Sequence, residues 1–298
     1  MSRSLVLAAA LLLVAATATP LGAPIQFTVR GVDDAMDLHG DPTGADLVIF
    51  AGGNQWFVMP ELLAAFKKAH PEFAKIFYET LPPGLLAEQM RNGALQVGDL
   101  VLRLKPDVYL SGKQRMIAMQ RARLVGPSVT YATNVLGMMV REGNPHGIRS
   151  LADLGRADVR VSMPNPKTEG IARQIEIAYT KAGGAALDRQ IMVTKVAAGT
   201  TLFTQIHHRQ TPMWILSGKA DAGPVWISEA QYQERIHSGI VAVALPTSEN
   251  VTATYLGSVV DTAPHRAAAK AFLAFLISPQ GQAIYRSYGF GPPVFSKE

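Results

Sequence analysis

The sequence predicts an α/β fold made of two similar halves. Short apolar runs typical of buried strands are followed by helical patterns, in the order strand, helix, strand, helix. The chain has 298 residues, which is too many for one ordinary domain and comfortable for two. The same layout returns in the second half. Because 48% of the residues are hydrophobic and only 17% are charged, a sizeable core is possible.

The first 18 residues predict a cleavable signal peptide. Arg3 precedes an uncharged apolar run from 5 to 16, and the small residues at 16–18 suit a signal peptidase that cuts after Ala18. The run is shorter than the roughly 20 residues that span a bilayer, and an uncleaved anchor is the alternative. Since the chain has no cysteine, disulfides and a lipid-anchored cysteine are excluded. We therefore expect a free protein in the periplasm.

The charge pattern argues against a nucleic-acid-binding face. The formal net charge is +5, and the cations are scattered along the chain, which gives at most a weak attraction for anions. Residues 24–45 form an irregular leader that contains His39 and several aspartates. Their spacing matches no known cation-binding loop, so we expect a solvated segment rather than a divalent-cation site.

In the first half, three predicted strands each lead into a helix. The apolar run 47–50 is followed by a turn with Gly53 and Asn54 and then by helical spacing that ends near Pro71. A strand at 74–79, a helix at 85–92 and a strand at 106–110 follow. Ser111 and Gln114 then form a capping-box pattern that predicts a helix headed by Ser111. Helix starts of this kind favour anions, although most of them bind nothing.

A long apolar strand at 131–140 predicts the passage from one domain to the other, and residues 142–145 have linker composition. The elements expected after it are, in order, a helical turn at 150–154, a strand at 159–163, a helix at 171–182 capped by Thr168, a helix at 200–206, an interruption at 207–212, a helical piece at 213–217, a strand at 222–227, a helix headed by Ser228, strands at 240–245 and 251–260, a helix at 265–277 and a last helix capped by Ser278.

Five stretches resemble the periplasmic molybdate-binding proteins and their tungstate-binding relatives, the substrate-binding components of ABC importers. They occur in the right order and are PDVYLS at 106–111, YATNVLGMMV at 131–140 with Gly-Asn-Pro at 143–145, NPKTEGIAR at 165–173, SGKADAGPVWISEA at 217–230 and AFLAFLISPQGQAIYRSYGF at 271–290. The resemblance implies a two-lobed type II periplasmic-binding-protein fold. Each lobe is then a mostly parallel sheet flanked by helices, two crossover strands join the lobes, and a cleft lies between them. We expect lobe I at 24–133 plus 250–298 and lobe II at 134–249.

In that family, the lobes close on a tetrahedral oxyanion held by hydroxyls and by backbone N–H groups at helix N-termini, usually without a balancing cation. The resemblance therefore implies a periplasmic solute-binding protein that captures an oxyanion, with molybdate or tungstate favoured. Its expected partner is a membrane ABC permease, in a transient contact. We expect a monomer without a cofactor. No enzyme is expected, since the chain has no G-x-S-x-G, His-Glu-x-x-His, P-loop or G-x-G-x-x-G pattern.

The ligand-binding residues that the resemblance implies lie in four turns: Gly53 and Asn54, Ser111, Lys167 and Thr168, and Trp226 with Ser228. Two turns depart from the family pattern. The first usually offers a Ser or Thr hydroxyl where this chain has Gly-Gly-Asn, and the fourth usually offers a Tyr where this chain has Trp226, which donates only one N–H. The alternative function is therefore an orphan periplasmic receptor for a different anion or a small carboxylate.

The segment 207–212 is unlike the family pattern and has three interpretations. Adjacent side chains point to different sides of a helix or strand, so His207 and His208 are not expected to share an ion, and no metal site is predicted. A polar loop at the cleft edge is the first interpretation. In the second, His208 and Arg209 reach the cleft and bind an anion. The third is a receptor for a metal cation that uses His207 and His208 together with His39 and the acidic leader.

Overall fold

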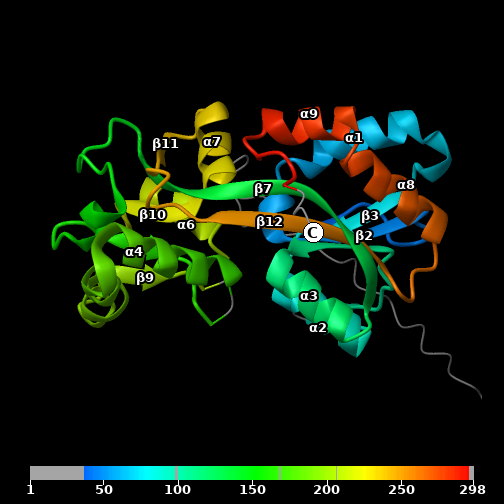
Figure 1. Cartoon of the computed structure of the whole chain (residues 1–298), viewed down its shortest axis with the longest axis horizontal. Coiled ribbons are helices and arrows are strands. Elements are labelled where there is room, and N and C mark those ends of the chain that lie inside the picture. Colours follow the sequence, from blue (N-terminus) through cyan, green and yellow to red (C-terminus); the bar gives the residue numbers. More distant parts are fainter. Residues whose placement is uncertain (1–36, 98–99, 168, 206, 295–298) are drawn as a thin grey trace, which may run out of the picture.

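Two lobes lie side by side and are joined by two long strands. The structure, a computed structural model, describes residues 37–97, 100–167, 169–205 and 207–294, so the expected signal peptide and the leader before 37 lie outside the described residues. Strands β7 (Val125–Arg141) and β12 (Thr252–Val260) run next to each other from one lobe to the other (Figure 1). Among the described residues, no helix has the length and apolar character needed to cross a membrane.

The first lobe is built on three parallel strands. Strand β2 (Leu47–Ala51) lies between β3 (Ile76–Glu79) and β6 (Val108–Gly112), and all five of its residues are buried. Such burial on both faces explains its continuous apolar run. The other elements of this lobe are β1 (Leu38–His39), η1 (Gly53–Gln55), α1 (Met59–Ala69), η2 (Pro71–Phe73), α2 (Pro83–Asn92), β4 (Leu95–Val97), β5 (Leu100–Leu102), α3 (Lys113–Arg121), α8 (Arg266–Leu276) and α9 (Pro279–Ser287).

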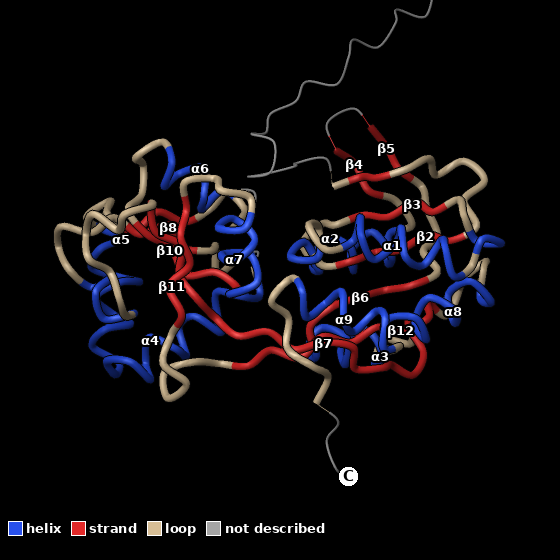
Figure 2. Tube along the Cα trace, turned by 90° about the horizontal axis from the view of Figure 1, so that it is seen from above, coloured by secondary structure: helices blue, strands red, loops and turns tan. Residues whose placement is uncertain are grey.

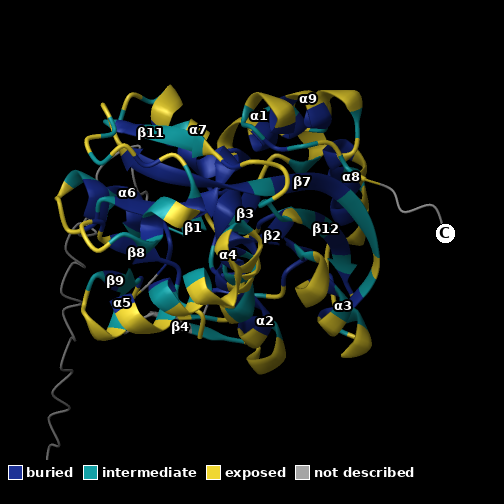
Figure 3. Cartoon of the chain, turned by 60° about the vertical axis from the view of Figure 1, so that its left-hand side comes forward, coloured by how far each residue is buried: buried dark blue, intermediate teal, exposed yellow. Residues whose placement is uncertain are grey.

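Helices cover both faces of the first-lobe sheet. Leu47, Ile49 and Ala51 belong to a core that also contains residues of α1, α8 and α9, whereas Val48 and Phe50 pack with residues of α2 and α3. This alternation follows the two-residue period of a strand. In Figure 3 the inner strands are mostly dark and buried, and the exposed residues gather on the outer sides of the helices and in the loops.

The second lobe repeats this plan with a second parallel core. Strand β8 (Val161–Met163) pairs in parallel with β9 (Thr201–Phe203) and β10 (Ala222–Trp226). The remaining elements are η3 (Leu151–Gly155), α4 (Gly170–Arg189), the π-helical turn η4 (Gln190–Thr194), α5 (Lys195–Ala197), α6 (Gln210–Leu216), α7 (Ile227–Arg235) and β11 (Ile240–Ala244).

Strand β7 makes the two sheets continuous. Its first part, from Val125 to Val135, pairs antiparallel with β12, and its last part, from Leu136 to Arg141, pairs with β10 on one side and β11 on the other. In the described part of the chain, the resulting sheet has ten strands. The long apolar strand predicted at 131–140 is therefore the strand that crosses between the lobes.

The structure corrects three predictions about local elements. Ser111 does not head a helix: it belongs to β6, and α3 begins at Lys113. Ser228 lies inside the first turn of α7, where its hydroxyl accepts a hydrogen bond of 2.8 Å from Asn134. Residues 201–203 form β9 rather than a helix, because parallel pairing with β8 outweighs local propensity.

Two further sequence signals concern helix ends, at Ser278 and at the glycines 183–184. The prediction for the last helix is confirmed, since the Ser278 hydroxyl accepts a hydrogen bond from Gly281 N at 3.2 Å and Pro279 is the first helical residue. The prediction that the glycines at 183–184 end a helix is also confirmed. Gly183 and Gly184 have non-helical backbone angles, with φ of −151° and 68°, and the part of α4 from there to Arg189 is a second helical piece.

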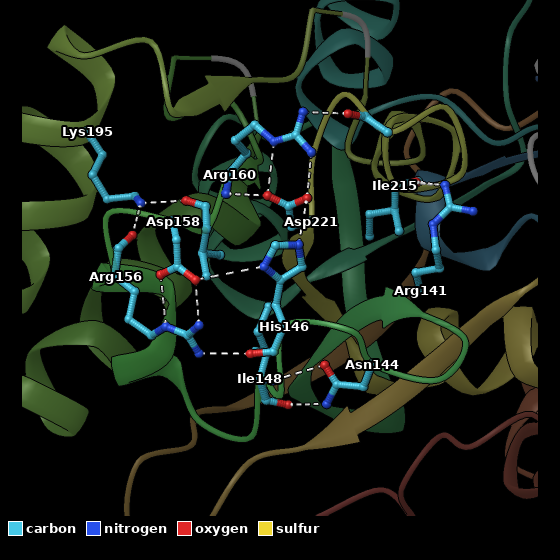
Figure 4. Close-up of polar contacts among 12 residues, drawn as sticks. Arg141, Asn144, His146, Ile148, Arg156, Asp158, Arg160, Lys195, Ile215 and Asp221 are labelled. Carbon is cyan, nitrogen blue, oxygen red and sulfur yellow. Dashed lines mark hydrogen bonds and ion pairs between the residues drawn. The ribbon is translucent and has the colours of Figure 1, made fainter.

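A polar network ties β8 to β10 in the second lobe (Figure 4). Arg160 precedes β8 and donates to Asp221, which precedes β10, through Nε at 3.0 Å and Nη2 at 2.6 Å. His146 Nε2 lies 3.3 Å from the same carboxylate, and Lys195 donates to two backbone carbonyls at 2.5 Å. These four described residues do not line the cavity between the lobes, so the network stabilises the lobe itself.

Candidate functional site

A cavity of about 480 Å³ lies between the lobes. The turn after β2 and the starts of α2 and α3 line it from the first lobe, and the starts of α4 and α7 with the loop before α6 line it from the second. Residues 252–255 of the crossover strand β12 complete the wall. In Figure 2, α7 lies on the side of the second lobe that faces the first. The cavity is thus formed by both lobes and by one of their connections.

Four helices begin at this cavity. The lining includes Pro83 and Gly84 of α2, Gly112 and Lys113 at the start of α3, Glu169 and Gly170 at the start of α4, and Trp226 immediately before α7. The first N–H groups of a helix have no partner within it, and this end of the helix dipole is positive. The preceding strands are parallel within each lobe, which brings the helix starts to one edge of each sheet. The cavity therefore presents donors suited to a negatively charged group.

Asn54 and Tyr255 supply polar side chains to the wall. Asn54 Nδ2 donates to the Tyr255 hydroxyl at 2.6 Å, and both residues are buried. Burial raises the pKa of Tyr255 well above its usual value, so this hydroxyl keeps its proton. Trp226 packs edge-on against the same ring, with centroids 6.1 Å apart. Since the hydroxyl already accepts from Asn54, it can donate its own proton to a bound group.

A histidine between two glutamates forms the wall of the second lobe. His208 Nδ1 lies 2.5 Å from Glu169 Oε2, and its Nε2 lies 2.9 Å from Glu229 Oε2. All three residues are buried. Burial alone would lower the pKa of His208, but the charge of Glu229 and the hydrogen bonds to both glutamates raise it to about 10. His208 is therefore a buried cation at neutral pH.

Glu169 is fixed in its charged form. Its Oε1 accepts hydrogen bonds from the Thr204 hydroxyl and from Asn165 N, and its Oε2 also accepts from His208 N at 2.7 Å. Burial alone would raise the pKa of Glu169, but His208 and these donors hold it below its usual value. Two carboxylates thus share one imidazolium, which leaves this wall with an excess of negative charge.

His207 explains the missing hydroxyl in the turn after β2. A Cβ on Gly53 would lie 2.4 Å from His207 Nε2 and 3.1 Å from the carbonyl oxygen of Thr80. The first contact is shorter than real Cβ atoms make and the second is tighter than most, so a side chain at position 53 would force His207 to move. The imidazole from the second lobe fills the space that a side chain at position 53 would need, so the glycine and the histidine depend on each other.

We expect Gly53→Ser to lower the free energy of unfolding by about 1 to 3 kcal/mol, because it overpacks this contact. Chemical denaturation measures the effect. The added cost should shrink when His207→Ala removes the imidazole, since the two changes act on one contact. Gly112→Ser is the matched control, because nothing lies within 4 Å of a Cβ there. Equal losses at the two glycines would contradict the argument.

Arg209 points away from the cavity and toward the first lobe. Its guanidinium forms an ion pair with Asp37 through Nη2, which also lies 3.4 Å from the Thr80 carbonyl oxygen. The group lies 5.7 Å from the centre of the Trp56 ring. His207 and Arg209 therefore both bridge the lobes, and Asp37 in the expected solvated leader is a partner in this bridge.

The structure brings only part of the predicted site together. Gly53, Asn54, Trp226 and His208 line the cavity, whereas Ser111, Lys167, Ser228 and Arg209 are not among the described lining residues. Lys167 is exposed, and Thr168 lies outside the described residues. For all nine residues of the predicted site, a role in ligand binding stays a prediction.

Sequence reasoning missed several polar residues of the cavity wall, and also Glu229, which contacts His208 but is not among the described lining residues. Lys113, Arg115, Glu169, Glu229 and Tyr255 were not among the predicted residues, although Glu169, Glu229 and Tyr255 are at least nine-tenths buried. Glu169 and Glu229 stand at helix starts within two of the motifs quoted above, where an acid is an ordinary N-terminal residue. No local pattern indicated that both would meet His208.

The fold and the cavity define a two-lobed binding protein of the periplasmic type. The chain belongs to the family of bacterial extracellular solute-binding proteins, whose family model matches residues 47–291. The molybdate-binding protein ModA of Mycobacterium tuberculosis is 26% identical over 259 residues, which are 85% of this chain and 88% of that protein. The expected family resemblance and fold class are confirmed.

Two solved structures share the fold. The sulfate-binding protein SubI of Mycobacterium tuberculosis superposes with a TM-score of 0.65 at 23% identity, over 83% of this chain and 85% of that one. The periplasmic molybdate-binding protein of Azotobacter vinelandii superposes with a TM-score of 0.64 at 16% identity, over 83% of this chain and 100% of that one.

Proposed function

We propose that this protein captures a small anion between its lobes and delivers it to a membrane ABC importer. The observation that carries the proposal is the convergence of four helix starts on one cavity. Relatives named for molybdate and sulfate support a four-oxygen ion as the ligand. Among such ions we put molybdate and tungstate first. Export through the signal peptide at 1–18, a periplasmic location and a monomeric state belong to the same proposal.

Charge in the cavity favours the first-lobe wall for the anion. Glu169 and Glu229 leave the second-lobe wall with an excess of negative charge, which repels an anion. Lys113 and Arg115 lie in the exposed part of the lining, next to the start of α3. We therefore expect the anion at the starts of α2 and α3, within reach of these two cations.

A small organic carboxylate is the second candidate ligand, and the cavity volume favours it. Pockets of roughly 300 to 1,000 Å³ commonly hold organic ligands. The volume of about 480 Å³ falls within this range. A single four-oxygen ion would need water or further lobe closure to fill it.

A thermal-shift panel on the mature protein tests the proposal. Molybdate, tungstate, sulfate, thiosulfate and small carboxylates are added in turn, and a true ligand raises Tm by several degrees at saturation. Lys113→Ala and Arg115→Ala should each weaken the best ligand by about three- to ten-fold. Arg121→Ala, on the same helix outside the described lining, is the control and should bind normally. If no anion raises Tm, the proposal is wrong.

A further inference from the structure

Three potential metal ligands meet on the second-lobe wall of the cavity. Glu169, His207 and His208 each offer one ligand atom, and these atoms all lie within 4.8 Å of one another. All three residues are buried and line the cavity. Among the described residues, no other group of three His, Cys, Asp or Glu side chains is this compact. The cluster joins the start of α4 to the loop before α6.

The two histidines are adjacent in sequence, yet their rings lie on the same side. Their centroids are 4.0 Å apart and the ring planes differ by 32°. Residues 207–209 form neither a helix nor a strand, so the alternation that separates neighbours in those elements does not apply. The argument against a shared ion that rests on regular backbone geometry is therefore wrong for this segment.

The distances fit an ion after a small movement. Two ligands at the tetrahedral angle on one ion are about 3.4 Å apart when each bond is about 2.1 Å. His208 Nδ1 and Glu169 Oε2 are 2.5 Å apart, so they need to separate by about 0.9 Å. In the complex, the ion takes the place of the proton that these two atoms share.

Each proposed ligand is held by a second group. Glu229 accepts from His208 Nε2 at 2.9 Å, which leaves Nδ1 for the ion, as in the carboxylate–histidine–metal arrangement of many metal sites. Thr204 and Asn165 N hold the other oxygen of Glu169. His207 Nδ1 accepts a hydrogen bond of 3.2 Å from Arg209 N, so this nitrogen carries a lone pair rather than a proton. A neutral imidazole is the form that binds metals.

A protonated His208 alone would account for the contacts with both glutamates, but it would not account for His207. Among the described contacts, this second ring makes no hydrogen bond to either glutamate, although its centroid lies only 4.0 Å from that of His208. A metal ion satisfies all of these groups together, because it neutralises the carboxylates and uses the lone pairs of both rings.

We propose that Glu169, His207 and His208 bind a divalent first-row transition-metal ion, with Zn²⁺ as the reference ion. Two imidazoles and one carboxylate suit such ions and leave coordination positions free on the cavity side. The site goes beyond the proposed anion capture and does not depend on it, since the anion is expected at the starts of α2 and α3.

Cobalt and zinc binding to EDTA-stripped, dialysed protein tests the site. One equivalent of Co²⁺ should give visible absorption bands that Zn²⁺ abolishes, and Zn²⁺ should raise Tm. His207→Gln and Glu169→Gln should each weaken Zn²⁺ binding by at least about ten-fold in calorimetry. His70→Gln is the matched control, because its ring lies beside Glu72 in the first lobe, outside the cavity lining. Circular dichroism verifies that each variant folds.

The outcomes separate this proposal from the anion proposal. Absence of Co²⁺ bands, or equal Zn²⁺ affinity in His207→Gln and His70→Gln, overturns the metal site, and an anion that still raises Tm of the stripped protein leaves anion capture standing. A ten-fold loss confined to the cavity variants supports the metal site. It does so even if no anion binds, in which case only the anion proposal fails.

Discussion

Replacing His208 by Ala is expected to lower the free energy of unfolding by about 3 to 5 kcal/mol, measured by denaturant titration in EDTA at neutral pH. The side chains of Glu169 and Glu229 are only 3% and 5% exposed, and the imidazolium lies between them. Its removal leaves two buried carboxylates that face each other without a cation. Each then loses its compensating charge and keeps the cost of desolvation.

Two further variants make this prediction specific. Adding Glu229→Gln to His208→Ala should recover part of the loss, because it removes one of the two repelling charges. His70→Ala, which breaks a half-exposed pair with Glu72, should cost no more than about 1 kcal/mol. A loss for His208→Ala as small as that for His70→Ala would mean that His208 carries no buried charge.

Much of the fold could be predicted because its signals are local. The apolar run of β2 and the cap and proline that start α9 are short patterns whose meaning does not depend on distant residues. The strand predicted at 131–140 was long enough to indicate a crossing. The strand is this long because β7 pairs with the crossover strand β12 and then with β10 and β11 of the second lobe.

Two of the failed predictions, Ser111 and the helix expected at 200–206, share one physical cause, which is competition with strand pairing. The capping-box spacing at Ser111 is correct, but β12 pairs with this residue and keeps it in β6. Likewise, residues 201–203 have a partner in β8 that a sequence window cannot reveal. A capping serine and a paired serine have the same sequence signal, so only the tertiary partner separates them.

For the site, the sequence indicated where the turns are but not which charges meet. Asn54 lies in the turn after β2, and Trp226 is the last residue of β10, so both line the cavity where their strands end. Glu169, His208 and Glu229 come from three separate elements, so their contact depends on how the loop before α6 folds back. Gly53 looked like the loss of a binding hydroxyl, and only the contact with His207 gives it a reason.

Replacing Asp37 by Asn is expected to lower the free energy of unfolding by about 3 to 5 kcal/mol. Asp37 in the first lobe pairs with Arg209 in the second, whose side chain is only 4% exposed. Among the described residues, Arg209 Nε and Nη1 have no hydrogen-bond partner, so this carboxylate supplies the main compensation for the buried guanidinium. Its loss leaves an unpaired cation at the contact between the lobes.

Because the pair joins the lobes, its loss should also change the shape of the molecule. The buried guanidinium of Asp37→Asn regains water only if the lobes separate, so small-angle scattering should show a larger radius of gyration than in the parent protein. Asp41→Asn is the control, since Asp41 is exposed in the same segment and accepts a hydrogen bond from Thr43 N. Adding Arg209→Met to Asp37→Asn should recover much of the stability and compactness, because an unbranched apolar side chain carries no charge to desolvate. If Asp37→Asn and Asp41→Asn behave alike, the ion pair does not hold the lobes together.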